Sequence, residues 1–265
     1  MKPYWILRHH GSSSIRSLHF AHNLLAVGDD AGHVSLVDLQ TLRPKYRWAA
    51  HSDSVLTVLV VAPDQVVSHA RDNTLKLWRL PSKLPQFGAG AASETPTPEE
   101  VRSIGVNALN FSKCAYHDGM VAVPNALDAA YIDILGLHTG RRIHEAVGRP
   151  DIPPSTRNRL PIVMSLHLLP NAVVAGYEDG HVKSWSLSGD RDLLWQTKCH
   201  SESVMSIAIH PRSNIGISVA ADDRIARFDL DSGTPHLAQT KTPGKASTAL
   251  APDANTFAVG GWDGS

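Results

Sequence analysis

Short segments in which apolar and polar residues alternate recur along the chain, and turn-forming residues separate them. TLKLW at 74–78 and HVKSW at 181–185 are two of these segments, and such alternation is typical of strands with one buried face. Asp72-Asn73 and Asp179-Gly180 precede them, and both pairs favour the positive φ angles of tight hairpin turns. Because helical patterns are nearly absent, the sequence predicts an all-β fold.

One turn sequence occurs twice, as HSDSV at 51–55 and HSESV at 200–204. Each copy is followed by an apolar stretch and then by an aspartate six residues before an aromatic residue, Asp72 before Trp78 and Asp222 before Phe228. Weaker copies complete a series of markers at Ala31, Asp72, Asp128, Asp179, Asp222 and Asp263, at intervals of 41, 56, 51, 43 and 41 residues. The chain is therefore a repeat, with insertions in two of its intervals.

A period of about 42 residues marked by His, Asp and Trp is typical of the four-stranded blade of a propeller. The segments resemble WD repeats, whose usual Trp-Asp ending is replaced here by Trp78-Arg79, Trp185-Ser186, Phe228-Asp229 and Val37-Asp38. We therefore expect a WD-repeat β-propeller with five recognisable blades and the start of a sixth. It would form a single domain over residues 4–265, incomplete at the C-terminus, with loop insertions at 81–105 and 140–161.

The length of the chain adds an expectation about completeness. Seven blades with these insertions would need about 317 residues, since a propeller closes only when all its blades are present. The chain has 265 residues. We therefore expect a truncated seven-bladed propeller that is open, prone to aggregate or dependent on a partner. A closed propeller of five blades and a remnant is the alternative.

His51, Ser68 and Asp72 are the residue types of a hydrolase triad, in which a histidine between an acid and a hydroxyl activates the serine. The same set recurs at nearly the same spacing as His200, Ser218 and Asp222. A catalytic site is built once, whereas a device of the fold recurs in each repeat, so we interpret both sets as structural. The resemblance to WD repeats implies a hydrogen-bonded chain through each set. Trp78 would join the first chain through its indole N–H, and Phe228 offers no donor to the second.

Composition excludes several classes of function. The formal net charge is zero, so we expect no direct binding of nucleic acid or of an anionic membrane. The chain has no apolar stretch of the roughly 18 residues that a membrane helix needs and no signal-peptide core at its start. Its fifteen histidines and two cysteines show no metal-site or disulfide spacing. The glycine-rich stretch at 89–93 lacks the Gly-Lys-Ser/Thr of a phosphate loop. We expect no cofactor and no metal.

Three segments carry a closer resemblance: ILRHHGSSSIRSLHF at 6–20, SHARDNTLKLWRL at 68–80 and VAVPNALDAAYIDI at 121–134. They look like the fungal ASTRA-associated WD-repeat family, a relative of the human guanine-nucleotide-binding-protein β-subunit-like protein. The last segment is the most specific, because generic WD repeats lack its Pro-Asn hairpin. His9 departs from the glycine common in the family.

The resemblance implies a non-catalytic scaffold in the ASTRA chromatin-linked complex, which assists the maturation of phosphatidylinositol kinase-related kinases. Its partners would be other ASTRA subunits and kinase co-chaperone components, in the nucleus and also in the cytoplasm. A substrate adaptor in another assembly, such as a ubiquitin ligase, is the first alternative. An enzyme that uses the central channel of the propeller is the second.

The candidates for a protein-binding face are the side chains that immediately precede turn aspartates: Arg71, Glu178 and Trp262. The resemblance implies that these turns open on one common rim, and an exposed tryptophan suits an interface anchor. Thr95-Pro96 and Thr97-Pro98 are weak candidates for phosphorylation.

Overall fold

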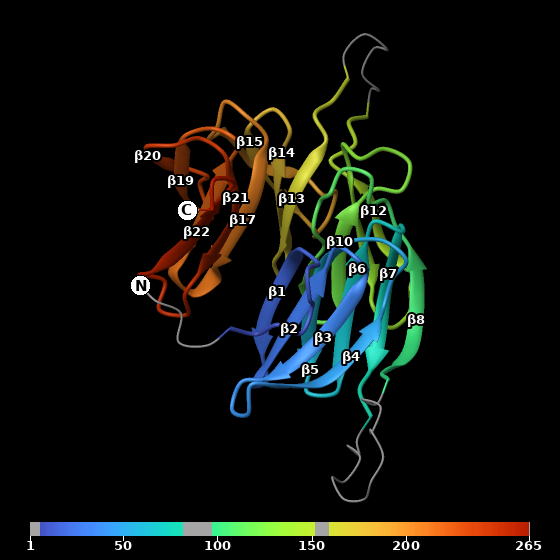
Figure 1. The fold of residues 1–265 in the computed structure, drawn as a ribbon. Helices are drawn as coiled ribbons and strands as arrows, with labels where there is room; N and C mark the ends of the chain where they lie inside the picture. The colour runs from blue at the N-terminus through green and yellow to red at the C-terminus, as the bar shows by residue number, and fades with distance from the viewer. Residues whose placement is uncertain (1–5, 82–96, 152–158, 265) are drawn as a thin grey trace, which may run out of the picture. The chain divides into compact units, whose positions relative to one another are not determined.

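The computed structural model describes residues 6–81, 97–151 and 159–264, and strands dominate this part of the chain (Figure 1). The single helical segment among these residues is the three-residue 3-10 turn Pro211–Ser213. No helix in the described residues is long and apolar enough to cross a membrane. The expectation of an all-β fold is confirmed. The chain divides into two compact units, Met1–Leu109 and Asn110–Ser265.

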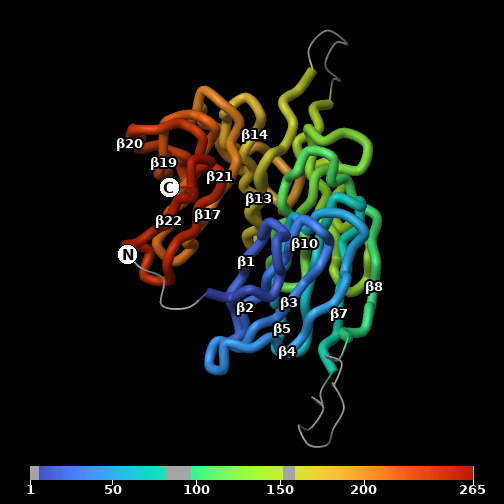
Figure 2. The backbone as a smooth tube through the Cα atoms, in the orientation of Figure 1, coloured from blue at the N-terminus to red at the C-terminus, as the bar shows by residue number. Residues whose placement is uncertain are grey.

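The first unit holds two four-stranded antiparallel sheets in its described residues. One sheet consists of β1 (Ile15–Ala21), β2 (Leu24–Asp29), β3 (His33–Asp38) and β4 (Arg43–Ala49). The other consists of β5 (Val55–Ala62), β6 (Gln65–Ala70), β7 (Thr74–Arg79) and β8 (Glu99–Gly105). Each strand pairs with the next along the chain, and the tube in Figure 2 follows these successive hairpins.

The second unit holds three four-stranded sheets and one two-stranded sheet in its described residues. The first sheet consists of β9 (Ala115–His117), β10 (Met120–Pro124), β11 (Ile132–Gly136) and β12 (Arg142–Val147). The second consists of β13 (Val163–Leu168), β14 (Ala172–Tyr177), β15 (His181–Ser186) and β16 (Leu193–Lys198). The third consists of β17 (Val204–His210), β18 (Ile215–Ala220), β19 (Arg224–Asp229) and β20 (Pro235–Gln239). The last pair is β21 (Lys245–Leu250) and β22 (Phe257–Gly261).

The turns between second and third strands form as the hairpin signals predict. Asn73 has φ 61° and Gly180 has φ 85°, both in the left-handed region. The carboxylate of Asp72 accepts a hydrogen bond from the Thr74 backbone N–H at 3.1 Å, as a side-chain turn does. The same bond recurs at Asp179 with His181, 3.2 Å, and at Asp222 with Arg224, 3.0 Å. The repeated aspartates therefore fix the same turn in three sheets.

The core of each unit lies between neighbouring sheets. In the first unit it joins apolar side chains of β2, β3 and β4 to those of β5, β6 and β7, and the rings of Trp48 and Trp78 meet edge to face with centroids 5.6 Å apart. In the second unit Trp195 and Phe228 meet at the same centroid distance. Aromatic pairs in this geometry add stabilisation beyond the area they bury.

Strands occupy part of both predicted insertions. β8 fills residues 99–105 of the insertion expected at 81–105, and β12 fills 142–147 of the one expected at 140–161. Both are exposed outer strands with polar sequences, so they lack the apolar run that would mark them. A Lys76–Glu100 ion pair of 2.9 Å helps to hold β8 on β7. The stretch at 89–93 and Thr95-Pro96 lie outside the described residues, and a single domain over 4–265 stays a prediction.

Candidate functional site

The first predicted set of polar residues comes together within the sheet of β5 to β8. The Trp78 indole N–H donates to Ser68 Oγ at 2.8 Å, and Ser68 Oγ lies 2.7 Å from His51 Nε2. His51 Nδ1 lies 2.9 Å from Asp72 Oδ2. Because the carboxylate can only accept, His51 carries its proton on Nδ1, and Nε2 accepts from the serine hydroxyl. The four side chains form one continuous chain of hydrogen bonds.

The second set forms the same arrangement in the sheet of β17 to β20. His200 Nε2 lies 2.9 Å from Ser218 Oγ, and His200 Nδ1 lies 3.1 Å from Asp222 Oδ1. The Asp222 carboxylate also accepts from the Ser201 backbone N–H at 3.0 Å, as Asp72 does from Ser52 at 3.2 Å. In both sheets the network therefore ties the loop before the first strand to the turn between the second and third.

Sequence reasoning missed a third network, in the sheet of β1 to β4. His10 Nδ1 lies 2.7 Å from Asp29 Oδ2, and His10 Nε2 lies 2.7 Å from Ser35 Oγ. The marker of this repeat, Ala31, precedes Gly32 in the turn as Asp179 precedes Gly180, but it has no carboxylate, and Asp29 at the end of β2 supplies one instead. The serine sits on the third strand rather than the second. The spacing of 41 residues between His10 and His51 was the signal that could have revealed it.

Burial sets the protonation of these groups. It lowers the pKa of His51 and of His200, although the neighbouring aspartate acts in the opposite direction in each case. Burial alone would raise the pKa of the Asp72 carboxyl, but hydrogen bonds from Thr74 and His51 outweigh it and hold that pKa below its usual value. The networks of His51 and His200 therefore pair a neutral imidazole with a carboxylate.

These geometries can stabilise the fold, but they do not present a nucleophile. Ser68, Ser218 and Ser35 have no exposed surface, so a substrate cannot reach their hydroxyls. Cys199 is also buried, and burial raises the pKa of its thiol to about 11. Among the described residues no group of three His, Cys, Asp or Glu side chains could hold a metal ion.

Arg71, Glu178 and Trp262 are exposed, and each lies in the turn that follows the second strand of its sheet. Arg71 belongs to the first unit; Glu178 and Trp262 belong to the second. Glu178 forms an exposed ion pair of 3.6 Å with Arg159. Trp262 is 63% exposed, and one side of its ring lies against Gly244.

Leu127 is a further exposed side chain at this turn position that was not predicted. It immediately precedes Asp128, as Glu178 precedes Asp179, and lies in the turn between β10 and β11. Its side chain is 85% exposed. The repeat frame would have identified it, because the marker Asp128 had already been placed. Two large exposed apolar side chains of the second unit, Leu127 and Trp262, therefore each follow the second strand of a sheet.

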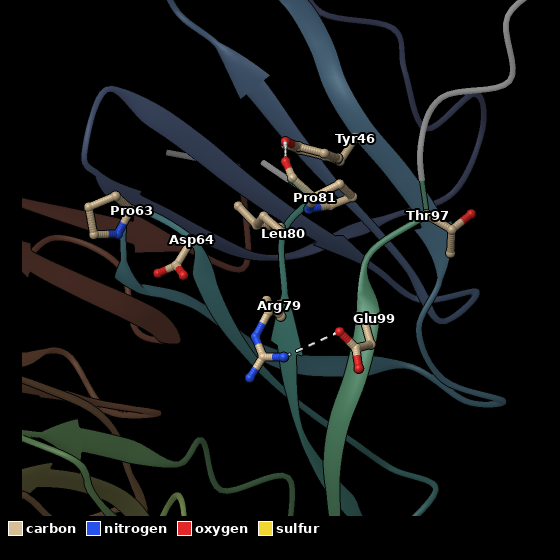
Figure 3. Close-up of a pocket in the computed structure, with 8 residues that line it drawn as sticks. All are labelled: Tyr46, Pro63, Asp64, Arg79, Leu80, Pro81, Thr97 and Glu99. Atoms are coloured by element: carbon tan, nitrogen blue, oxygen red, sulfur yellow. Dashed lines mark hydrogen bonds and ion pairs between the residues drawn. The ribbon is translucent and has the colours of Figure 1, made fainter. Parts of the chain in front are cut away.

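A pocket of about 590 Å³ lies at the ends of β4, β7 and β8 in the first unit (Figure 3). Its lining residues are Tyr46, Pro63, Asp64, Arg79, Leu80, Pro81, Thr97 and Glu99. The Tyr46 hydroxyl donates to the Pro81 carbonyl at 3.0 Å, and Arg79 pairs with Glu99 at 3.4 Å. Two pairs of its lining groups thus bind one another.

The chain is similar to curated fungal proteins over nearly its whole length. It is 30% identical to ASTRA-associated protein 1 of Verticillium alfalfae, a match that covers 98% of this chain and 71% of the relative. The protein of the same name from Aspergillus niger is 30% identical over 98% and 74% of the two chains. That from Schizosaccharomyces pombe is 27% identical over 99% and 85%. No protein-family model matches the chain.

One solved structure, the crystal structure of the computationally designed Ika8 protein, matches with a TM-score of 0.65. The match covers 97% of this chain and 71% of that one, at 21% identity. At that identity the likeness concerns the fold alone. Together with the antiparallel four-stranded sheets and the near absence of helix, the structure is consistent with a β-propeller.

Proposed function

Because the chain belongs to the ASTRA-associated protein 1 family, we propose that it is a non-catalytic scaffold that associates with an ASTRA assembly through protein–protein contacts. The resemblance noted from the sequence is confirmed, since relatives of that name match nearly the whole chain in several fungi. This shared family is the observation that carries the proposal. The burial of the three network serines also supports a structural rather than a catalytic use of the histidines.

We propose that the sheets are the blades of a WD-repeat propeller. The His–Ser–Asp networks, found in three of the sheets, support a common repeat unit. A scaffold of this design offers rigid sheets with exposed turns, and rigid turns bind partners without a large cost of ordering.

The family resemblance carries the remaining parts of the proposal. The assembly would be chromatin-linked and would act with co-chaperone components in the maturation of phosphatidylinositol kinase-related kinases. The protein would then reside in the nucleus, with a cytoplasmic pool, and would bind neither nucleic acid nor membranes directly. A fluorescent fusion in a fungal cell tests the nuclear location, and exclusion from the nucleus would contradict it.

The exposed turns that follow the second strand of each sheet are the candidate contact surface. Arg71 and Glu178 offer charge, and Trp262 offers a large exposed ring of the kind enriched at interface centres. Leu127 adds an exposed apolar side chain in the second unit. We propose that these turns bind the assembly partners, whereas the buried networks only hold the turns in place.

Affinity purification of the tagged chain followed by mass spectrometry tests this function. We expect ASTRA subunits, co-chaperone components and large kinases with the unmodified chain. We expect their depletion with the combined change Arg71→Glu, Glu178→Arg and Trp262→Ala, because all three side chains are exposed and contribute little to the fold.

A matched control places equivalent changes on the outer strands β8, β12 and β16: Arg102→Glu, Glu145→Arg and Leu194→Ala. These residues are also exposed, so this variant should retain the partners. Equal recovery of partners with both variants would remove the turn assignment but leave the scaffold proposal intact. Recovery of cullin-type subunits instead of ASTRA subunits would contradict the proposed function itself.

A further inference from the structure

At two contacts between neighbouring sheets of one unit, a tryptophan of the outer strand packs on the aromatic residue of the following sheet. Trp48 of β4 meets Trp78, and Trp195 of β16 meets Phe228, each pair with ring centroids 5.6 Å apart. The receiving rings of Trp78 and Phe228 are 5% and 1% exposed. In both places a ring from the preceding sheet therefore encloses the aromatic residue of the repeat.

Trp185 is the equivalent residue of the sheet β13–β16, and the outer strand before it supplies no such ring. Like Trp78 and Phe228, it follows its turn aspartate by six residues. The outer strand of the preceding sheet, β12, reads RIHEAV and contains no tryptophan, tyrosine or phenylalanine. Trp185 is accordingly only partly buried, although it packs on the same apolar core as the residues of β10 and β11.

A pocket of about 580 Å³ lies beside Trp185 at this contact between sheets. It is lined by residues 145–151, at the end of β12 and after it, and by Trp185, Asp190 and Arg191. All of these residues belong to the second unit. Gly148 lies against the indole, since a Cβ atom added there would be 3.1 Å from Trp185 Cζ2. A smaller pocket of about 140 Å³ shares Gly148, Pro150 and Trp185 with the first.

The groups around the pocket suit a flat aromatic ring. The indole of Trp185 is available for an edge-to-face contact of the kind that Trp48 and Trp195 make. The Arg191 guanidinium donates to the Glu145 carbonyl at 3.1 Å and so stands at the same pocket. Planar guanidinium groups stack on aromatic faces. The volume also lies within the range of about 300–1,000 Å³ that is usual for binding pockets.

We propose that this pocket receives a tryptophan side chain of a partner protein, which takes the place that Trp48 and Trp195 hold at the other two contacts. Those contacts identify the occupant, because the chain fills the equivalent space with tryptophan both times. Tryptophan is also enriched among the residues that dominate interface energies. The inference rests on the proposed scaffold function for its partner, but it concerns a different surface from the exposed turns. It depends on the ring of Trp185 and the space beside Ala146, so the outer-strand control variant with Glu145→Arg still binds.

Saturation-transfer difference NMR with N-acetyl-L-tryptophanamide as the probe tests the pocket. We expect transfer to the indole protons with the unmodified chain, and a loss of transfer when N-acetyl-L-leucinamide is the probe. Ala146→Trp places a ring of the chain itself in the pocket and should abolish transfer to the indole. Ile143→Trp is the matched control, because Ile143 lies on the same strand, is 50% exposed and is not a lining residue. It should bind the probe like the unmodified chain.

Affinity purification with the same two variants tests whether a partner supplies the ring. ASTRA subunits should be depleted with Ala146→Trp and retained with Ile143→Trp. Equal recovery with both variants would overturn this inference and leave the scaffold function intact. A purification of the unmodified chain that contains no ASTRA subunit would contradict the scaffold function and, with it, this inference. Circular dichroism establishes that each variant is folded, and Ala146→Leu replaces Ala146→Trp if the latter is not.

Residues 152–158, which lie outside the described part of the chain, are the other occupant that the NMR experiment separates. A variant in which a Gly-Ser linker of equal length replaces them should bind the probe like the unmodified chain. Transfer to the indole only with the linker variant would show that this segment, and not a partner, occupies the pocket. That result would overturn the proposal. So would the absence of transfer with the unmodified chain, or transfer that persists with Ala146→Trp.

Discussion

The sheets β5–β8 and β17–β20 build the same polar network around different aromatic residues. His, Ser and Asp occupy equivalent places in both, but Trp78 donates its indole N–H to Ser68 at 2.8 Å, whereas Phe228 has no donor. The cross-strand neighbours differ as well, since Trp78 faces Val66 and Phe228 faces Gly216. The Phe228 ring fills the space of a side chain at Gly216, where an added Cβ would meet it at 2.2 Å.

This difference separates the contribution of the indole hydrogen bond from that of ring packing, which Trp78 combines in one residue. The His–Ser–Asp bonds persist in β17–β20 without a fourth member, so the aromatic residue is not needed to assemble them. What both sheets share at this position is a large buried ring: Trp78 and Phe228 are 5% and 1% exposed. We infer that ring packing supplies most of the stabilisation and the indole hydrogen bond a smaller part.

Truncation of either ring should have the largest effect. We expect Trp78→Ala and Phe228→Ala each to reduce the free energy of unfolding by about 3–5 kcal/mol, as large aromatic truncations in cores do. Denaturant titrations of the two variants measure the loss. A reduction below about 1 kcal/mol for Trp78→Ala would show that this ring is not packed as described. A large loss for Trp78→Ala alone would show that the indole bond, rather than the ring, dominates.

The repeat made the best-formed sheets predictable from the sequence. The marker aspartates Asp72, Asp179 and Asp222 fall in equivalent turns because a carboxylate that accepts from the backbone two residues later fixes that turn locally. Local chemistry of this kind is visible in the sequence. The network residues His51 and His200 were predictable because each precedes a serine and an aspartate at nearly the same spacing.

Features that depend on pairing between distant segments were missed. β8 forms because β7 offers it an edge to pair with. Its polar sequence lacks the alternation of apolar residues from which a strand is predicted. The His10 network was not predicted, because its aspartate and serine occupy different positions in the repeat from those of the later sheets. The close contact between Gly28 and Val55 was not predicted, because glycine is required there only once the next sheet places a valine against it.

Acidification should destabilise the two networks alike, because it protonates the histidine that both contain. Burial lowers the pKa of His51 and His200 in the fold, so the unfolded chain binds protons more readily near the usual histidine pKa of about 6.5. The stability that neutral histidine contributes is therefore present above that pH and is lost as the pH falls below it. We expect a lower Tm at pH 5.5 than at pH 7.5.

Single substitutions distinguish the two histidines in this experiment. His51→Gln and His200→Gln should each reduce the difference in Tm between the two pH values, and by similar amounts. Thermal melts at both pH values give the result. If only His51→Gln changed the pH dependence, Trp78 would have to influence the protonation of its network, and the two networks would not be equivalent.

The smallest effect isolates the indole hydrogen bond itself. Trp78→Phe gives the first network the composition of the second, and a net hydrogen bond contributes about 0.5–1.5 kcal/mol. We expect a double-mutant cycle of Trp78→Phe with Ser68→Ala to show a coupling energy in that range.

The matched cycle pairs Phe228→Leu with Ser218→Ala, at the same sequence separation. Because Phe228 donates nothing to Ser218, the two changes should add to within about 0.5 kcal/mol. Equal coupling in the two cycles would mean that the serine senses ring packing rather than the N–H donor. The difference between the sheets would then lie in Val66 and Gly216, opposite the rings, and not in the network.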